Sequence, residues 1–142
     1  MNKSAASHHE WAPQDNELPQ RVTNNSHVIA IASGKGGVGK TNITTNRGIA
    51  LSMRGNEVCI FDADTSLANI NIVLGLRPEF TLEHFLEEDK PLDEIMVEGP
   101  RGLRVIPAAS GIADYAKLSA DKQKKLLTGL SQLESRFDYL LI

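Results

Sequence analysis

Residues 34–41 combine glycines, a lysine and a hydroxyl in a pattern suited to binding phosphate. They read GKGGVGKT, which fits G-x-x-x-x-G-K-[ST] between an apolar run and a helical stretch. The glycines permit positive φ angles and carry no Cβ atoms, so successive N–H groups can turn towards an anion. Lys40 supplies a charge for the β and γ phosphates, and Thr41 a hydroxyl for Mg²⁺. The alternative, a glycine-rich turn with an incidental Lys-Thr, is disfavoured because strand, loop and helix all agree.

Two carboxylates, Asp62 and Asp64, follow the apolar run at residues 58–61. That place corresponds to the carboxyl end of a parallel strand, where open α/β sheets bind their ligands. A carboxylate there can hold a water on Mg²⁺ or orient the water that attacks a γ phosphate. Both could instead be turn residues or a helix cap, since Asp is common in each. The phosphate loop one strand earlier favours the chemical role.

Three segments carry a resemblance to a known family. The loop at residues 34–41 resembles the deviant Walker A loop, K-G-G-x-G-K-[ST], of the MinD/ParA ATPases. Residues 62–76 (DADTSLANINIVLGL) and 103–111 (LRVIPAASG) are similar to the MinD branch, and within it to the flagellar number regulators FlhG and FleN. The resemblance covers residues 28–142 and implies an ATP-dependent dimerising switch ATPase that regulates flagellar number or placement.

The resemblance also implies roles for individual residues, with ATP and Mg²⁺ as cofactors. Lys35 would reach across a nucleotide-sandwich homodimer to the phosphates of the other subunit. Asp62 would lie near the waters of Mg²⁺, and Asp64 would position the attacking water. The catalytic residues are then Lys35, Lys40 and Asp64, and the metal site is Thr41 with Asp62. The expected cofactor-binding residues are Gly34, Lys35, Gly36, Gly37, Val38, Gly39, Lys40, Thr41 and Asn42.

The chain departs from the family pattern in three places. The family usually has an apolar residue where this chain has Arg47, which would bury a charge unless that face is exposed or paired. Residues 65–66, Thr-Ser, replace the usual apolar-Gly step of switch I. The sequence ends at Ile142, where the family's Walker B aspartate and switch II would follow. We therefore expect a C-terminally truncated domain, with ATPase activity in the complete domain and weak or no activity in this chain.

Apolar runs alternate with helical stretches from residue 28 onwards, which predicts an α/β fold with a doubly wound, mostly parallel sheet of the P-loop NTPase type. The expected strands are residues 28–32, 58–61, 103–106 and 139–142, and the expected main helices are residues 41–54 and 119–135. Short helices are expected near Phe85 and near Ile95. In the last helix, apolar residues recur at helical spacing, and Ser119 is a plausible N-cap.

The two ends of the sequence have different characters. Residues 1–26 are polar and lack apolar periodicity, so we expect a disordered N-terminal extension ahead of the domain portion at residues 27–142. Residues 139–142 read as a buried strand that no polar turn closes. We expect this strand to have an uncovered flank, whose hydrogen-bonding edge would promote aggregation and poor solubility.

Composition limits the location and the partners. The formal net charge of -3 gives no electrostatic reason to expect nucleic acid as a partner. No stretch approaches the roughly 20 apolar residues that span a bilayer, and no secretory signal is present, so we expect a cytoplasmic protein. The expected partners are a second copy and flagellar regulatory or assembly proteins. Membrane association would need the family's amphipathic C-terminal helix, which lies outside this sequence. Cys59 is interpreted as a buried strand residue.

Two other functions remain open at this point. One is a truncated module that binds nucleotide or a protein partner without hydrolysis, which the absence of Walker B and the unusual Arg47 favour. The other is a MinD-like division-site ATPase or a ParA-like partition ATPase. Sequence separates these poorly, because cellular function depends on partner surfaces rather than on the fold.

Overall fold

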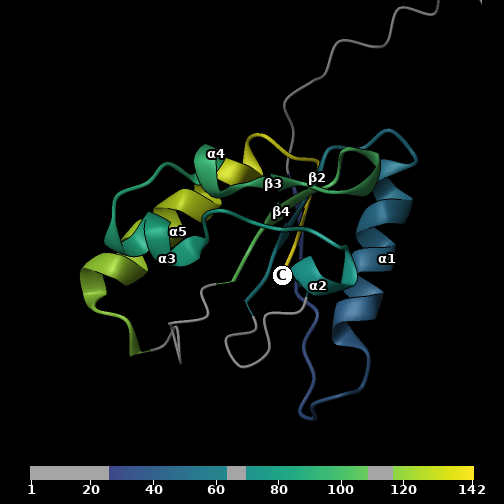
Figure 1. Cartoon of the computed structure of the whole chain (residues 1–142), viewed down its shortest axis with the longest axis horizontal. Coiled ribbons are helices and arrows are strands. Elements are labelled where there is room, and N and C mark those ends of the chain that lie inside the picture. Colours follow the sequence, from purple (N-terminus) through teal and green to yellow (C-terminus); the bar gives the residue numbers. More distant parts are fainter. Residues whose placement is uncertain (1–25, 64–69, 109–116) are drawn as a thin grey trace, which may run out of the picture.

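The computed structural model describes residues 26–63, 70–108 and 117–142. Its central feature is a sheet with helices on both faces (Figure 1). The elements in chain order are β1 (His27–Ile29), α1 (Lys40–Ser52), β2 (Val58–Phe61), α2 (Ile70–Val73), α3 (Leu82–Glu87), α4 (Leu92–Ile95), β3 (Val97–Glu98), the 3₁₀ turn η1 (Pro100–Gly102), β4 (Arg104–Ile106), α5 (Ala120–Glu134) and β5 (Tyr139–Leu141). The α/β class predicted from the alternating pattern is confirmed.

The strand order is β1-β5-β2-β4-β3, with parallel pairing throughout except between β3 and β4. The strands β2 and β4 are direct neighbours, whereas α1 joins β1 to β2 across β5 and α5 joins β4 to β5 across β2. A parallel sheet needs such crossovers and is covered on both faces, which explains why its strands are continuous apolar runs. All four residues of β2 are buried.

The position of β5 corrects one expectation. Leu140 pairs with Val28 on one side and with Cys59 on the other, so β5 lies inside the sheet and is hydrogen-bonded along both edges. Leu140 and Leu141 are almost completely buried. The outer strands of the sheet are β1 and β3. Strand β1 runs parallel to its neighbour β5, and among the described residues no strand pairs with its other edge, where Val28 is 47% exposed. An edge of this kind can pair with another chain, so the aggregation risk belongs to β1 and not to β5.

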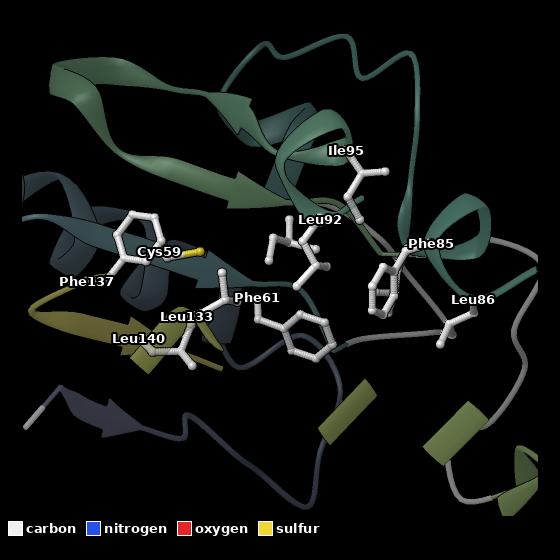
Figure 2. Packing of buried hydrophobic residues seen from close by; sticks show 11 residues of the cluster. Cys59, Phe61, Phe85, Leu86, Leu92, Ile95, Leu133, Phe137 and Leu140 are labelled. Atoms are coloured by element: carbon white, nitrogen blue, oxygen red, sulfur yellow. The ribbon is translucent and has the colours of Figure 1, made fainter. Parts of the chain in front are cut away.

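Alternate residues of the strands divide the core into two layers. Val58 and Ile60 face α1 and α2, together with Leu103, Val105 and Leu141. Cys59 and Phe61 face the opposite layer, which contains α3, α4 and α5 (Figure 2). The buried residues of this second cluster are Cys59, Phe61, Leu82, Phe85, Leu86, Leu92, Ile95, Ile106, Leu133, Phe137 and Leu140. The helical periodicity read in α5 is confirmed, because Leu126 and Leu130 also pack against this cluster.

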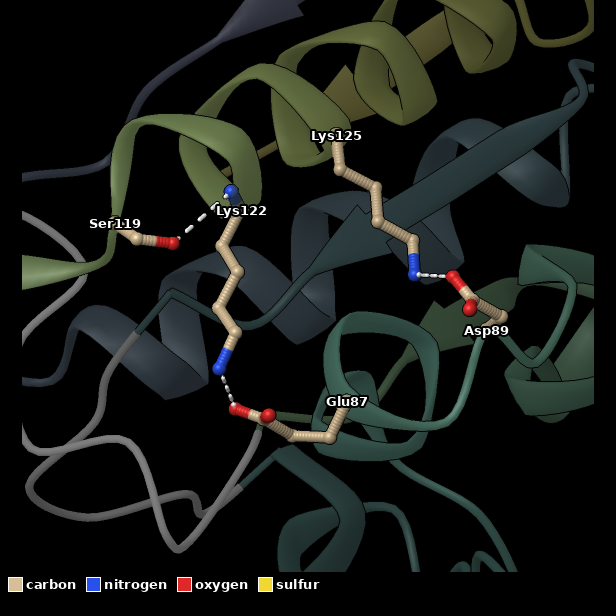
Figure 3. A network of polar contacts seen from close by, with 5 residues as sticks. All are labelled: Glu87, Asp89, Ser119, Lys122 and Lys125. Carbon is tan, nitrogen blue, oxygen red and sulfur yellow. Dashed lines mark hydrogen bonds and ion pairs between the residues drawn. The ribbon is translucent and has the colours of Figure 1, made fainter.

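Polar contacts at the start of α5 join it to the end of α3 (Figure 3). Ser119 is the N-cap, and its hydroxyl accepts a hydrogen bond from the Lys122 backbone N–H at 3.4 Å. Lys122 forms an ion pair with Glu87, and Lys125 Nζ lies 2.5 Å from Asp89 Oδ1. The hydrogen bond from Lys125 lowers the pKa of the Asp89 carboxyl. Exposed ion pairs contribute little to stability, so these contacts orient α5 while the apolar cluster holds it.

Candidate functional site

A cleft of about 850 Å³ opens at the carboxyl ends of β1, β2 and β5. The connection from β1 to α1 forms one wall, residues 61–63 and helix α2 line another, and Ile142, just after β5, also lies among the lining residues. Open α/β sheets place their ligands at this end of the strands. The cleft therefore brings the predicted phosphate loop and the predicted acidic strand end together, although they are separated in sequence.

The backbone of the loop has the conformation that its glycines were expected to allow. Gly37 and Gly39 have φ angles of 73° and 93°, in the left-handed region that side chains with a Cβ rarely adopt. A Cβ atom built at either position would meet no atom within 4 Å. The backbone conformation therefore requires glycine at these two positions, and the loop surface stays open to a ligand that approaches the main chain.

Helix α1 begins directly after this loop and presents its N-terminus to the cleft. Its N-cap is Gly39, which has no side chain to accept hydrogen bonds from the first turn, and that turn contains no acidic residue. The first N–H groups of a helix have no partner within the helix, and together with the helix dipole they favour an anion. Lys40 and Thr41 stand in this first turn and both line the cleft.

The two lysines of the loop have different surroundings. Lys40 is partly buried, and its Nζ donates to the hydroxyl oxygen of Ser33 at 3.2 Å. Lys35 is exposed, and its backbone carbonyl accepts a hydrogen bond from the same hydroxyl at 2.7 Å. Ser33 was not among the predicted site residues. Its place immediately before Gly34 is the only sequence signal that points to it.

Asp62 is the acidic residue that the structure places in the cleft. It directly follows β2, is 4% exposed, and its backbone N–H donates to the carbonyl of Ile106 at 3.2 Å. A buried carboxylate is favoured by a nearby cation, and carboxylate and hydroxyl oxygens are the ligands that Mg²⁺ prefers. Asp62 and Thr41 therefore suit the magnesium ion of a nucleotide complex. Asp64 lies outside the described residues, so its catalytic role stays a prediction.

One feature of the surroundings was not foreseen. The short helix α2 contributes Ile70, Ile72 and Val73 to the lining of the cleft. Ile72 and Val73 are 70% and 49% exposed, so the mouth of the cleft is partly apolar.

Arg47, which stands where the family usually has an apolar residue, is exposed on α1, so its charge is not buried. In the parts of the chain that the structure describes, no helix has both the length and the apolar character needed to cross a membrane.

The family follows from the loop, its helix and a direct comparison. A model of the ParA family, described as NUBPL iron-transfer P-loop NTPase, matches residues 24–99. This chain belongs to the ParA family of P-loop NTPases. The resemblance to the MinD/ParA proteins inferred from the deviant Walker A loop is thereby confirmed.

Relatives within the ParA family include flagellar and division proteins. The antiactivator FleN of Pseudomonas aeruginosa is 40% identical over 81% of this chain and 41% of its own length. The flagellum site-determining protein YlxH of Helicobacter pylori is 36% identical over 83% of this chain and 40% of its own. The septum site-determining protein MinD of Thermotoga maritima is 39% identical over 82% and 43%. The chain thus spans about 40% of the length of these relatives.

Solved structures show the same fold. MinD of Pyrococcus horikoshii, complexed with Mg-ADP, superposes with a TM-score of 0.66 at 29% identity, over 82% of this chain and 48% of its own. The MinC:MinD complex of Aquifex aeolicus gives 0.66 at 35% identity, over 82% and 46%. Cobyrinic acid a,c-diamide synthase of Mycobacterium smegmatis, with a bound ATP analog and magnesium, gives 0.70 at 26% identity, over 82% and 50%. The doubly wound P-loop NTPase fold is confirmed, and this chain covers part of the ParA-family domain.

Proposed function

We propose that this chain forms the phosphate-binding part of an ATP-dependent dimerising switch ATPase that regulates flagellar number or placement. The observation that carries the proposal is the cleft, where the phosphate loop, the uncapped start of α1 and the buried Asp62 carboxylate share one cavity. This combination of anion-binding and cation-binding groups suits the phosphates and the magnesium ion of ATP. The Mg-ADP and ATP-analog complexes of the structural relatives support the same ligand.

Each group has a distinct task in this proposal. The loop N–H groups and the Lys40 ammonium bind the β and γ phosphates, while Thr41 and Asp62 hold Mg²⁺. The metal ion, when bound, would offset the negative charge of the phosphates. Asp64 orients the water that attacks the γ phosphate, a positioning task that dominates phosphoryl transfer.

The second subunit enters through Lys35. Lys35 is exposed and lines the cleft together with Lys40, which supports our proposal that its side chain reaches the phosphates of a second copy. Hydrolysis would then require two ATP-bound copies and would release them afterwards. The dimer, its cytoplasmic location and its flagellar protein partners are all parts of this proposal.

The cellular process in this proposal is inferred from the relatives of the chain. The likeness to FleN and YlxH supports control of flagellar number or placement. The MinD of Thermotoga maritima is almost equally similar, which keeps a division-site ATPase as the second candidate, beside a ParA-like partition ATPase. Deletion of the gene separates these candidates. Loss of a flagellar regulator is expected to change the number or position of flagella, whereas loss of a division-site protein is expected to produce minicells.

A binding module that holds nucleotide or a protein partner without hydrolysis is the remaining alternative. The test compares residues 1–142 with a chain extended to the length of those relatives. We expect the extended chain to hydrolyse ATP and to dimerise only when ATP is bound, measured by phosphate release and light scattering. Residues 1–142 are expected to show weak or no turnover. An extended chain that binds ATP without hydrolysis or dimerisation would favour the binding module.

A further inference from the structure

One hydroxyl group connects the two lysines of the phosphate loop. The Ser33 O–H donates to the backbone carbonyl of Lys35 at 2.7 Å, and Lys40 Nζ donates to Ser33 Oγ at 3.2 Å. A serine hydroxyl has one hydrogen to donate and two lone pairs to accept with. The two hydrogen bonds therefore use different capacities of the same oxygen and can coexist. Each strengthens the other, because a hydroxyl that donates becomes a better acceptor.

The position of Ser33 makes this contact relevant to ligand binding. Ser33 and Lys40 line the same cleft from opposite ends of the loop, one just before Gly34 and the other in the first turn of α1. The Lys40 side chain therefore extends back across the loop to reach Ser33. A flexible lysine that is already held in this way loses less conformational freedom when a phosphate arrives.

We propose that Ser33 is a positioning residue of the nucleotide site, which presupposes the nucleotide binding proposed above. It holds the Lys40 ammonium over the loop before nucleotide arrives. An ammonium group has three hydrogens to donate, so Lys40 can keep its bond to Ser33 and still donate two to phosphate oxygens. Ser33 acts through Lys40 and needs no contact with the phosphates.

The second bond extends this role to the shape of the loop. By accepting from Ser33, the Lys35 carbonyl is fixed relative to the chain that leads out of β1. That carbonyl belongs to the residue whose exposed side chain is proposed to act on a second copy. The Ser33 hydroxyl thus fixes the position of the Lys35 backbone carbonyl and of the Lys40 ammonium group.

The substitutions Ser33→Thr and Ser33→Val provide a matched pair, because they differ by exchange of a hydroxyl for a methyl group of similar size. Ser33 is exposed, so both side chains have room. We expect Ser33→Thr to keep the affinity of the full chain for Mg-ADP, measured by calorimetry. Ser33→Val and Ser33→Ala are expected to weaken it about fivefold, the loss of one solvent-exposed hydrogen bond. Equal affinities of the Thr and Val variants, with equal melting temperatures, would overturn the proposal.

A second measurement tests the contact without nucleotide. Lysines of the nucleotide-free chain are labelled with an amine-reactive reagent and quantified by mass spectrometry. Lys40 is expected to label faster in Ser33→Val than in Ser33→Thr, because its ammonium has lost its partner, while the exposed Lys124 labels equally in both. Equal labelling of Lys40 would contradict the inference. If the parent chain fails to bind Mg-ADP, the proposed function fails, whereas labelling still decides the role of Ser33.

Discussion

A Cβ atom built on Gly48 of α1 would lie 3.0 Å from the Cδ1 atom of Ile60 on β2. It would also lie 3.1 Å from Cδ1 of Leu103, so helix α1 rests directly on the sheet at this point. Real Cβ contacts are rarely this short, and the neighbouring side chains are themselves fully buried. The phosphate loop is therefore anchored by a helix whose distance from the sheet is set by a glycine.

We predict that Gly48→Val lowers the free energy of unfolding by about 1–3 kcal/mol, the usual cost of overpacking a core. Ala50→Val on the same helix is the control, because residue 50 is exposed and carries only the cost of a β-branched side chain in a helix. Urea unfolding followed by circular dichroism measures both. Equal destabilisation by the two variants would show that α1 does not pack this closely.

Burial raises the pKa of the Cys59 thiol from 9.0 to about 12, against the opposing effect of the positive charges of Arg136 and Arg104. The folded chain therefore keeps this thiol protonated at pH 8, and we predict that it reacts with a thiol reagent only on unfolding.

The same shift predicts how stability depends on pH. Above pH 9 the unfolded chain ionises its Cys59 thiol while the folded chain does not. Stability should fall as pH rises from 9 towards 12, by up to about 1.4 kcal/mol per pH unit from this group. Cys59→Ala should lack that component, and an unchanged pH dependence would contradict the prediction.

Lys35 tests the proposed dimer. In a chain extended to the length of its relatives, Lys35→Ala should leave nucleotide binding by the monomer nearly intact, because Lys40 and the loop N–H groups remain. ATP-dependent dimerisation should weaken, since each subunit loses a charge proposed to reach the phosphates of the other. Light scattering with and without ATP measures this. Dimers as stable as those of the parent chain would reject the action of Lys35 across subunits.

Asp64 tests the proposed hydrolysis step, again in the extended chain. Asp64→Ala is expected to bind ATP with the affinity of the parent but to fail in turnover, because the attacking water is no longer oriented. Phosphate release under single-turnover conditions, alongside calorimetric binding, separates the two effects. Turnover at the parent rate would remove Asp64 from the catalytic residues and leave it the alternative role of a turn residue or helix cap.

Local sequence patterns predicted most of the helices and strands, but they did not predict which strands pair with one another. The run at residues 58–61 is apolar throughout and is a fully buried strand, and the periodic leucines of α5 face the core. The central place of β5 could not be read from sequence, because it depends on pairing Leu140 with Val28 and Cys59, both distant along the chain. Helix α2 (INIV) was missed because apolar residues occupy three of its four positions, whereas α4 (LDEI) carries its apolar residues at the helical spacing of i and i+3.

The candidate site divides in the same way. The loop at residues 34–41 could be predicted because its residues are contiguous and each residue type has a recognisable task. Asp62 could be placed because it follows a strand whose carboxyl end faces the loop. Ser33 could not, since a serine before a glycine has many ordinary roles and only the position of Lys40 Nζ reveals this one.

The most direct test of the account is calorimetric titration of Mg-ATP into the parent chain, Lys40→Ala and Lys124→Ala. Lys40 lines the cleft, whereas Lys124 is an exposed lysine on α5 that offers the same loss of charge away from it. We predict that the parent and Lys124→Ala bind Mg-ATP with the same affinity, while Lys40→Ala shows no binding and melts at the parent temperature. Binding by Lys40→Ala with the affinity of the parent would contradict the assignment of residues 34–41 as the nucleotide site.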